Sequence, residues 1–232
     1  MVIQKLSSSL RNQIKCMPNG LFWNTVTPLL RAALTKMMEE GPFQQFRLVG
    51  GTSLSLQLGH RFSVDIDLFT DAAYNSIDFG VIDNFLRDSF TYVSEPQQGV
   101  IGMGQSYLIG ESEDESVKLD LYHTDAFIQP ELLVDPFRLA TVEEIIAMKI
   151  DIVQRVARKK DFWDLHELLA QYTPSQMIEL HKTRYPYNHD EELIRTNFTN
   201  FTIADEGFDP ICLKGKYWEL IKYDFVQVLR QS

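Results

Sequence analysis

Residues 46–70 read FRLVGGTSLSLQLGHRFSVDIDLFT, and this stretch decides the fold. An apolar run leads into a Gly-Gly break, a short helical pattern follows, a second break comes at Gly59, and an alternating run extends from Val64 to Phe69. Side chains of a strand alternate between two faces, whereas apolar positions in a helix recur about every 3.6 residues. The stretch therefore predicts a strand, a turn, a helix, a second turn and a second strand.

The alternating run places two carboxylates on one strand face. Val64, Ile66 and Leu68 would share one face, and Asp65 and Asp67 the other. Two carboxylates side by side repel each other unless a cation or protons lie between them. Oxygen ligands of this kind suit Mg²⁺ bound together with substrate phosphates. The alternative is a solvated strand face with two surface aspartates; we favour the metal site because the glycine turn lies upstream.

The Gly-Gly turn predicts a site for an anion. Gly50 and Gly51 allow the backbone to approach a ligand closely. A helix that begins here would present free N–H groups and the positive end of its dipole to the turn. Thr52 or Ser53 would add a hydroxyl donor, or would only cap the helix. No lysine follows at the position that a Walker loop requires.

Together these motifs resemble a known family. Residues 49–51, a spacer and Asp65-x-Asp67 resemble the nucleotidyltransferase (polymerase β-like) signature, in which a glycine turn and an Asp-x-Asp strand bind a nucleoside triphosphate and Mg²⁺. Residues 50–54 and 60–69 are more similar to AbiEii/AbiGii-type nucleotidyltransferases, toxins of bacterial toxin–antitoxin and abortive-infection systems. The resemblance implies an α/β (α+β) fold with a nucleotidyltransferase-like mixed sheet and helices, followed by a mostly helical C-terminal half.

The turn differs from that of many superfamily members, which have Gly-Ser. Here the hydroxyls come only at Thr52 and Ser53, and the spacer before Asp65 is long, which suits the toxin branch. The resemblance implies that the nucleotide phosphates bind at Gly50, Gly51, Thr52, Ser53, Arg61 and Lys149.

The resemblance also implies a third carboxylate on a later strand. In residues 117–122, VKLDLY, the apolar side chains would share one face and Asp120 would lie opposite. Asp120 would complete a metal-binding triad with Asp65 and Asp67 that holds two Mg²⁺ ions, and it would act as the base in an in-line displacement. The alternative is an exposed charge on an edge strand. The acidic residues 111–115 read as a solvated hairpin loop.

A helix after Thr141 carries the lysine that the family has near the triphosphate. Thr141 followed by Glu144 predicts a capping box. Lys149 falls inside the apolar stripe of this helix, so it would either extend its ammonium group to the surface or meet an anion at the edge of the core. The resemblance implies contact with the triphosphate, and a catalytic role.

Asp161 and Asp164 resemble the Asp-x-x-Asp element that follows this lysine in the family. Three positions apart, they would share one helical face and pair with Lys149, Arg155 or Arg158 as supporting residues. The alternative is a pair of carboxylates favoured by the helix dipole. We expect Asp164, in an apolar stretch, to be buried.

The remaining pattern is helical. Residues 1–45 predict helices, including residues 21–38, and helical patterns recur at residues 174–182 and 216–229, with a loop at residues 204–210. We expect a nucleotidyltransferase core with N-terminal helices at residues 1–139, a helical C-terminal domain at residues 140–232, and an active site in the cleft between them.

Composition limits the classes of function. No stretch is long and apolar enough for a transmembrane helix or a signal peptide, so we expect a cytoplasmic protein with no membrane partner. Two distant cysteines, Cys16 and Cys212, predict free buried thiols. The net charge of −10 argues against broad affinity for nucleic acid. Two local patches could still contact RNA, or be solvated helix faces: Arg155, Arg158, Lys159 and Lys160, and Lys182, Arg184, Tyr185 and Tyr187.

We therefore expect a toxin-like enzyme that moves a nucleotide from a nucleoside triphosphate to an RNA acceptor such as the end of a tRNA, and that a cognate antitoxin restrains. One alternative is nucleotidyl transfer to a small molecule or a protein. The other is a non-catalytic nucleotide-binding relative.

Overall fold

The computed structural model describes residues 20–39, 41–98 and 103–230 of the 232-residue chain. Its strands are β1 (Arg47–Leu48), β2 (Asp65–Thr70), β3 (Tyr92–Val93), β4 (Gln97–Gln98), β5 (Gly104–Gly110), β6 (Ser116–His123), β7 (Leu132–Val134) and β8 (Phe137–Leu139). Its helices are η1 (Trp23–Thr25), α2 (Pro28–Glu39), η2 (Gly41–Phe43), α3 (Gly50–Leu58), α4 (Phe79–Ser89), α5 (Val142–Arg155), α6 (Lys159–Leu168), α7 (Pro174–Arg184), α8 (Glu191–Asn197), α9 (Thr202–Asp205) and α10 (Trp218–Arg230).

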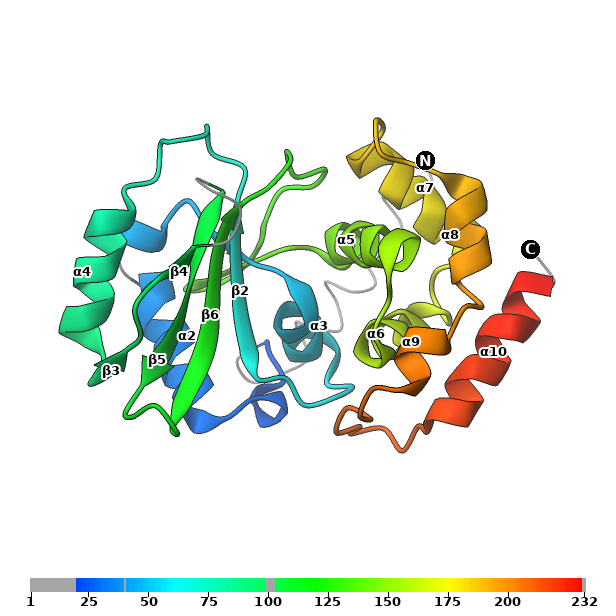
Figure 1. Cartoon of the computed structure of the whole chain (residues 1–232), viewed down its shortest axis with the longest axis horizontal. Coiled ribbons are helices and arrows are strands. Elements are labelled where there is room, and N and C mark those ends of the chain that lie inside the picture. The colour runs from blue at the N-terminus through cyan, green and yellow to red at the C-terminus, as the bar shows by residue number, and fades with distance from the viewer. Residues whose placement is uncertain (1–19, 40, 99–102, 231–232) are drawn as a thin grey trace.

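The strands form one mixed sheet. Its order is β3-β5-β6-β2-β1-β8-β7, with β4 paired to β5. Strands β2 and β6 are parallel neighbours at its centre, whereas β1 is antiparallel to β2 and parallel to β8. Helices α2 and α4 cover one face, and α3 lies on the other (Figure 1). The predicted α/β (α+β) class with a mixed sheet and a helical C-terminal half is confirmed.

The stretch that decides the fold has the predicted order of elements. β1, α3 and β2 follow one another between residues 47 and 70. Ile66 and Leu68 are fully buried. Val64 departs from the prediction: its side chain is 54% exposed, because β2 begins only at Asp65.

The N-terminal helix is shorter than residues 21–38. Helix α2 begins at Pro28, whose fixed φ and missing N–H suit the first turn of a helix. Before it, residues 23–25 form a short 3-10 turn, and the Phe22 amide donates to the Leu56 carbonyl. The helices predicted for residues 1–19 lie outside the described residues.

The helical half agrees with most of the predicted segments. The patterns at residues 174–182 and 216–229 correspond to α7 and α10. The loop predicted to begin at residue 204 begins at residue 206, because α9 ends at Asp205. The exposed turn at residues 111–115 is as predicted.

The capping box at the start of α5 is half formed. The Thr141 hydroxyl accepts a hydrogen bond from the Glu144 amide at 3.3 Å, as predicted. The Glu144 carboxylate does not return to the cap. It accepts the Ile128 and Gln129 amides at 2.8 Å and 3.2 Å, and a hydrogen bond from the buried Arg184. Glu144 therefore ties the β6–β7 connection to the helical half.

Two hydrophobic clusters fill the protein. One lies under the sheet with α2 and α4, and the other lies among the helices from α5 onward. Helix α3 contributes to both, since Leu56 belongs to the first cluster and Leu54 and Leu58 to the second. The division at residues 139 and 140 stays a prediction.

The helix lengths and the cysteines bear on two further predictions. No helix in the described ranges is long and apolar enough to cross a membrane. Cys212 is a free thiol, as predicted, but it is half-buried, because its sulfur accepts the Lys214 and Lys216 amides of a tight surface turn. Cys16 lies outside the described residues.

Candidate active site

Two of the predicted carboxylates lie side by side at the centre of the sheet. The parallel register of β2 and β6 pairs Asp67 with Asp120, and Asp65 with Lys118. Partial burial, together with the charges of Asp120 and Asp65, raises the pKa of Asp67 to about 6. The negative charges of Asp65 and Asp120 therefore act directly on the carboxylate of Asp67.

The two outer carboxylates have lysine partners, and the central one has none among the described residues. Asp120 accepts the Ser106 hydroxyl at 2.5 Å on Oδ1, and the Lys118 ammonium lies 2.5 Å from its Oδ2. The Lys160 ammonium lies 3.4 Å from Asp65 Oδ2. Among the described side chains, none donates to the carboxylate of Asp67.

These residues suit a divalent cation by their chemistry. The unpartnered Asp67 carboxylate and its repulsion from Asp120 and Asp65 are what a cation between them would relieve. Carboxylate oxygens are also the ligands that Mg²⁺ prefers. In the part of the chain that the structure describes, no three His, Cys, Asp or Glu side chains gather closely enough to hold a metal ion. The predicted triad of Asp65, Asp67 and Asp120 therefore stays a prediction as a metal site.

The glycine turn lies directly beside these carboxylates. Helix α3 begins at Gly50, whose φ of 66° favours glycine, and its N-cap residue, Val49, makes no side-chain cap hydrogen bond. A Cβ at Gly50 would lie 2.5 Å from Asp67 Oδ2, and a Cβ at Gly51 would lie 2.1 Å from Arg61 Nη2. The absence of both side chains therefore leaves room for a carboxylate and a guanidinium group at the start of the helix.

The two hydroxyls after the glycines are engaged inside the protein. The buried Thr52 hydroxyl hydrogen-bonds to the Asp65 carbonyl and, at 2.8 Å, to the Ser63 hydroxyl. The buried Ser53 hydroxyl accepts Gln57 Nε2 at 3.0 Å. In this arrangement Thr52 holds the start of β2 in place, and neither hydroxyl caps α3. Their predicted contact with phosphate is untested.

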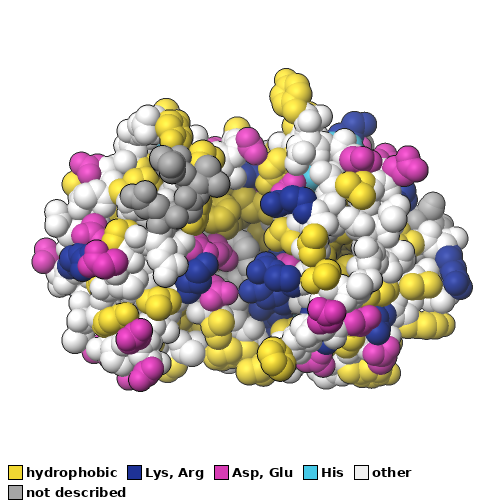
Figure 2. All heavy atoms as spheres, in the orientation of Figure 1, with side chains coloured by type: hydrophobic (Ala, Val, Ile, Leu, Met, Phe, Trp, Pro, Cys, Tyr) yellow, Lys and Arg dark blue, Asp and Glu magenta, His cyan; other side chains and the backbone are white. Residues whose placement is uncertain are grey.

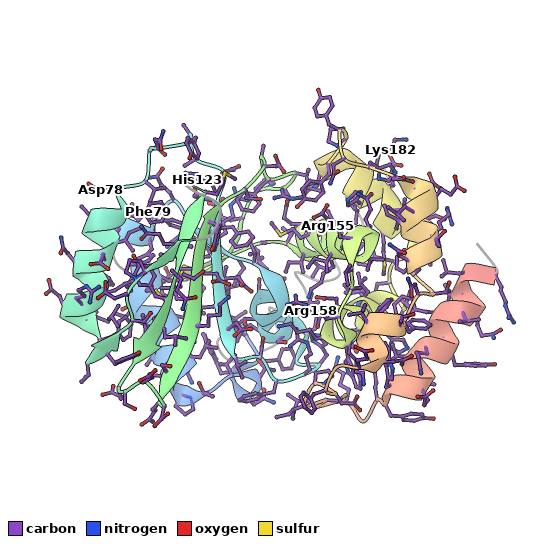
Figure 3. All side chains as sticks on the ribbon, in the orientation of Figure 1. Asp78, Phe79, His123, Arg155, Arg158 and Lys182 are labelled. Carbon is purple, nitrogen blue, oxygen red and sulfur yellow. The ribbon has the colours of Figure 1, made fainter. Side chains whose placement is uncertain are left out.

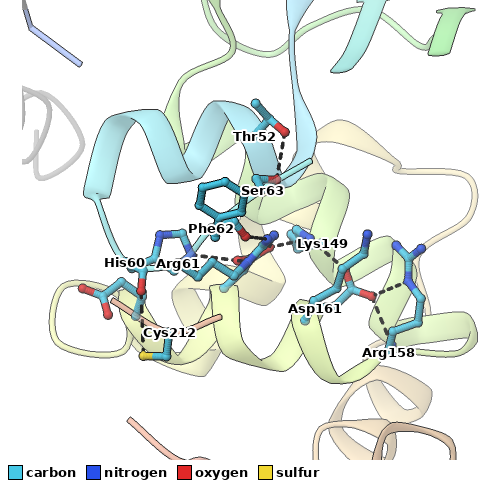
Figure 4. A network of polar contacts seen from close by, with 12 residues as sticks. Thr52, His60, Arg61, Phe62, Ser63, Lys149, Arg158, Asp161 and Cys212 are labelled. Carbon is cyan, nitrogen blue, oxygen red and sulfur yellow. Dashed lines mark hydrogen bonds and ion pairs between the residues drawn. The ribbon is translucent and has the colours of Figure 1, made fainter. Parts of the chain in front are cut away.

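Asp164 is the centre of a buried charged cluster. Figure 4 shows its partners His60, Arg61 and Lys149 close together. Its Oδ1 accepts His60 Nε2 at 2.8 Å and Arg61 Nε at 2.6 Å, while its Oδ2 accepts Arg61 Nη2 at 2.9 Å and lies 2.7 Å from Lys149 Nζ. Burial alone would raise the pKa of Asp164, but the charges of Arg61 and Lys149 hold it well below its usual range. The predicted burial of Asp164 is confirmed.

Lys149 links this cluster to the second aspartate of α6. Its ammonium donates to Asp161 Oδ1 at 2.7 Å, and Asp161 Oδ2 accepts Arg158 Nε at 3.1 Å. Burial opposes the charge on Lys149, yet Asp161 and Asp164 raise its pKa. The lysine is 4% exposed, so the alternative in which it reaches the surface is wrong. The predicted pairing of both aspartates with basic residues is confirmed; it includes Arg61 and excludes Arg155, which pairs with Asp151.

Several residues of this site were not predicted to belong to it. Burial lowers the pKa of His60, so its neutral ring donates to Asp164 through Nε2; its Nδ1 has no partner among the described atoms. Lys118, Lys160 and Ser106 contact the carboxylates of Asp120 and Asp65. A usable signal existed for Lys118, because a residue two positions before Asp120 in a strand lies on the same face.

Both predicted RNA-contacting patches lose a member to the interior. Lys159 is buried, pairs with Asp209 at 2.9 Å and lies over the Trp218 ring. Arg184 is buried against Glu144. The labelled Arg155 and Arg158 lie near the boundary between the sheet and the helices, and Lys182 lies further from the sheet (Figure 3).

A hollow separates the two halves on the face shown in Figure 2, and acidic and basic side chains gather around it. This arrangement joins a carboxylate pair, an uncapped helix N-terminus and flanking lysines, which is suited to binding a charged phosphate compound with a cation. Over residues 32–222 the chain matches the model of the nucleotidyl transferase AbiEii toxin family, a type IV toxin–antitoxin system. The chain belongs to this family. The resemblance drawn from residues 49–69 is thereby confirmed.

Relatives of this AbiEii-family protein extend along most of its length. An uncharacterized protein of Aquifex aeolicus (strain VF5) is 27% identical over 208 residues, which cover 87% of this chain and 94% of that protein. A crystal structure of a candidate nucleotidyltransferase from H. pylori has a TM-score of 0.56 at 18% identity and covers 87% of this chain and 91% of its own. That of JHP933 from Helicobacter pylori has a TM-score of 0.54 at 17% identity, with 87% and 88% covered. The two crystal structures share the fold.

Proposed function

We propose that this AbiEii-family nucleotidyltransferase moves a nucleotide from a nucleoside triphosphate to a hydroxyl of an RNA acceptor, with the end of a tRNA as the acceptor. The observation that carries the proposal is the pairing of Asp67 with Asp120 on parallel strands beside the uncapped start of α3. Family membership supplies the reaction class. The acceptor, the metal and the antitoxin are parts of the proposal.

The chain's own groups have separate tasks in the reaction. Backbone N–H groups at the start of α3 would bind phosphate oxygens, since the N-cap residue, Val49, offers them no side-chain acceptor. Asp65, Asp67 and Asp120 would hold two Mg²⁺ ions, which would supply positive charge to the phosphate oxygens. The buried cluster around Asp164 fixes Arg61 beneath Gly51 and Lys149 beside Asp161.

Asp120 would take the proton of the acceptor hydroxyl. Ser106 donates to Oδ1 of Asp120 and the Lys118 ammonium lies on Oδ2, so Oδ2 would receive the proton once Lys118 has moved away. The acceptor oxygen then forms a bond to the α-phosphorus, the bond to the bridging oxygen breaks, and pyrophosphate leaves with its electron pair. This is the in-line displacement typical of nucleotidyl transfer.

The charge of the protein agrees with a local RNA contact. A chain with a net charge of −10 has little general attraction for the phosphate backbone, so the acceptor would be held near the hollow. A cognate antitoxin would restrain the enzyme in a toxin–antitoxin or abortive-infection system. A cytoplasmic location stays a prediction from the sequence.

The test is an incubation of the purified protein with each labelled nucleoside triphosphate, Mg²⁺ and total tRNA. Label on RNA in the complete reaction, and none in EDTA, is the expected result. Label on protein or on a small molecule would favour those acceptors instead. Triphosphate binding with no labelled acceptor of any kind would favour a non-catalytic relative. Growth arrest on expression, relieved by the product of an adjacent gene, would identify the antitoxin.

A further inference from the structure

The two cations expected to bind phosphate, Arg61 and Lys149, form ion pairs with aspartates inside the protein. Arg61 and Lys149 lie against Asp164 and Asp161, and all four side chains are buried. This group of two cations and two anions is electrically balanced. It therefore brings little surplus positive charge to a bound triphosphate.

The surplus cations near the carboxylates are two lysines, Lys118 and Lys160, that were not predicted to bind phosphate. The side chains of Lys118 and Lys160 are 48% and 38% exposed, and they lie on Asp120 and Asp65. Lys118 comes from β6, in the sheet half, and Lys160 comes from α6, in the helical half. Figure 2 shows basic side chains on both sides of the acidic ones in the hollow.

We propose that Lys118 and Lys160 exchange partners during the reaction cycle: they hold Asp120 and Asp65 before the metal binds, and they bind the phosphates of the nucleotide once divalent cations occupy the carboxylates. This inference rests on the proposed function, because it deepens the phosphate-binding role of the same site.

The exchange is physically inexpensive. An ammonium group and a divalent cation compete for the same carboxylate oxygens, and exposed lysine–carboxylate pairs contribute little to stability. Once displaced, each ammonium stays on a flexible stem near the carboxylates, where a triphosphate brings new negative charge. The central carboxylate, Asp67, needs no exchange, because no described side chain donates to it.

The first test measures metal binding without nucleotide. Mn²⁺ affinity is titrated in the full-length protein and in Lys118→Gln and Lys160→Gln, with Lys36→Gln as the control, since Lys36 is an exposed lysine of α2. Removal of a competing ammonium should tighten Mn²⁺ binding roughly 2- to 10-fold in the first two variants. The control should match the wild type.

The second test measures phosphate binding at saturating Mn²⁺, with inorganic tripolyphosphate as the probe. Lys118→Gln and Lys160→Gln should bind it about 10- to 100-fold more weakly, as expected for the loss of a charged hydrogen bond. Lys118→Arg and Lys160→Arg keep the cation and should retain most of the affinity. Far-ultraviolet circular dichroism checks that each variant is folded.

Each outcome decides the proposal. Tighter Mn²⁺ binding with weaker tripolyphosphate binding supports the exchange. Unchanged tripolyphosphate affinity makes the lysines simple counter-ions and overturns it, as does Mn²⁺ binding that fails to tighten. Neither measurement needs an acceptor. A wild-type protein that binds tripolyphosphate but labels no RNA would overturn the proposed acceptor while leaving the result for the lysines intact.

Discussion

Asp67 lies opposite Asp120 on the neighbouring parallel strand, and no described side chain donates to its carboxylate. Asp67 is therefore a carboxylate that lies beside a second carboxylate and has no hydrogen-bonded cation among the described side chains. Most other buried or half-buried acids of this site have a basic partner, as Asp120, Asp161 and Asp164 do. The position of Asp67 therefore predicts opposite effects on stability and on activity.

Asp67→Asn should abolish nucleotidyl transfer and stabilise the metal-free protein. The folded pKa of about 6 lies above the ordinary value of 3.8. The folded state therefore holds the extra proton between these values, and wild-type stability falls as the pH rises through them. Asparagine cannot ionise, so the variant should avoid this loss in the free energy of unfolding, which reaches about 3 kcal/mol above pH 6. Urea unfolding in EDTA at acid and alkaline pH, beside the transfer assay, measures both effects.

The response of Asp67→Asn to Mg²⁺ is the control for the assigned metal site. Mg²⁺ should stabilise the wild type and leave Asp67→Asn unchanged, because a ligand that binds only the folded state raises its stability. An active Asp67→Asn enzyme would contradict the assigned metal site. Equal pH profiles for the two proteins would contradict the repulsion between the carboxylates.

Removal of the central acid of the buried cluster should destabilise the protein. Asp164→Asn leaves Arg61 and Lys149 with one carboxylate fewer between them. Breaking a buried ion pair costs about 3–5 kcal/mol. Because the folded pKa of Asp164 is depressed, its contribution is present above the ordinary value and is lost as the pH falls through the folded pKa. The variant should therefore lose less stability in acid than the wild type does.

Asp209→Asn is the matched control for this measurement. Asp209 also pairs with a buried lysine, Lys159, but its own side chain is 57% exposed. Exposed partners of this kind contribute about 1 kcal/mol or less. Denaturant titration of both variants at neutral pH should separate them clearly, and equal losses would show that burial of the carboxylate does not set the cost.

Local patterns were enough to predict the first half of the site. The alternation in residues 64–69 and 117–122 correctly placed Ile66, Leu68 and the apolar positions of β6 in the core. It did so because one face of each strand is buried, so that the period of two appears in the sequence. The family resemblance then associated Asp120 with Asp67, which are 53 positions apart and adjacent in the parallel register.

Partners across long distances in the sequence could not be predicted in the same way. Asp164 meets Arg61 over a separation of 103 positions, and Lys160 meets Asp65 over 95. No periodicity carries such information, because the pairing depends on how the helical half packs against α3. The same reason explains Arg184: its basic and aromatic neighbours in the sequence suggested a surface patch, while its actual partner, Glu144, lies on another helix.

The Glu144–Arg184 pair should contribute to stability rather than to RNA binding. Arg184 donates to the Glu144 carboxylate and to the Ala126 carbonyl, with its guanidinium buried. Arg184→Met leaves Glu144 buried without its counter-charge, which should cost about 3–5 kcal/mol. Lys182→Met, an exposed position of the same helix, should change stability by less than about 0.5 kcal/mol. Thermal unfolding of the two variants makes the comparison.

An RNA-binding measurement separates this role from the predicted patch. If Arg184 acts only through Glu144, folded Arg184→Met protein at low temperature should bind tRNA as the wild type does. Weaker tRNA binding without any loss of stability would instead restore Arg184 to a surface that contacts RNA.

Gly51→Ala should break one of the two hydrogen bonds that Arg61 donates to Asp164. The new Cβ would lie 2.1 Å from Arg61 Nη2, so the guanidinium has to move and the 2.9 Å hydrogen bond from Nη2 to Asp164 Oδ2 is lost. Loss of a charged buried hydrogen bond predicts a drop of about 2–3 kcal/mol in the free energy of unfolding, with reduced transfer. Gly41→Ala is the control, because no atom of the described residues, its chain neighbours aside, lies within 4 Å of its Cβ position.

A double-mutant cycle shows whether the clash with Arg61 is the cause. In an Arg61→Ala background the guanidinium is absent, so Gly51→Ala should cost less than about 0.5 kcal/mol. Free energies of unfolding for the wild type, both single variants and the double variant give the coupling energy. A coupling near zero would mean that Gly51 is required for some other reason, such as close approach of the phosphate to the backbone, and the loss would then appear in nucleotide affinity rather than in stability.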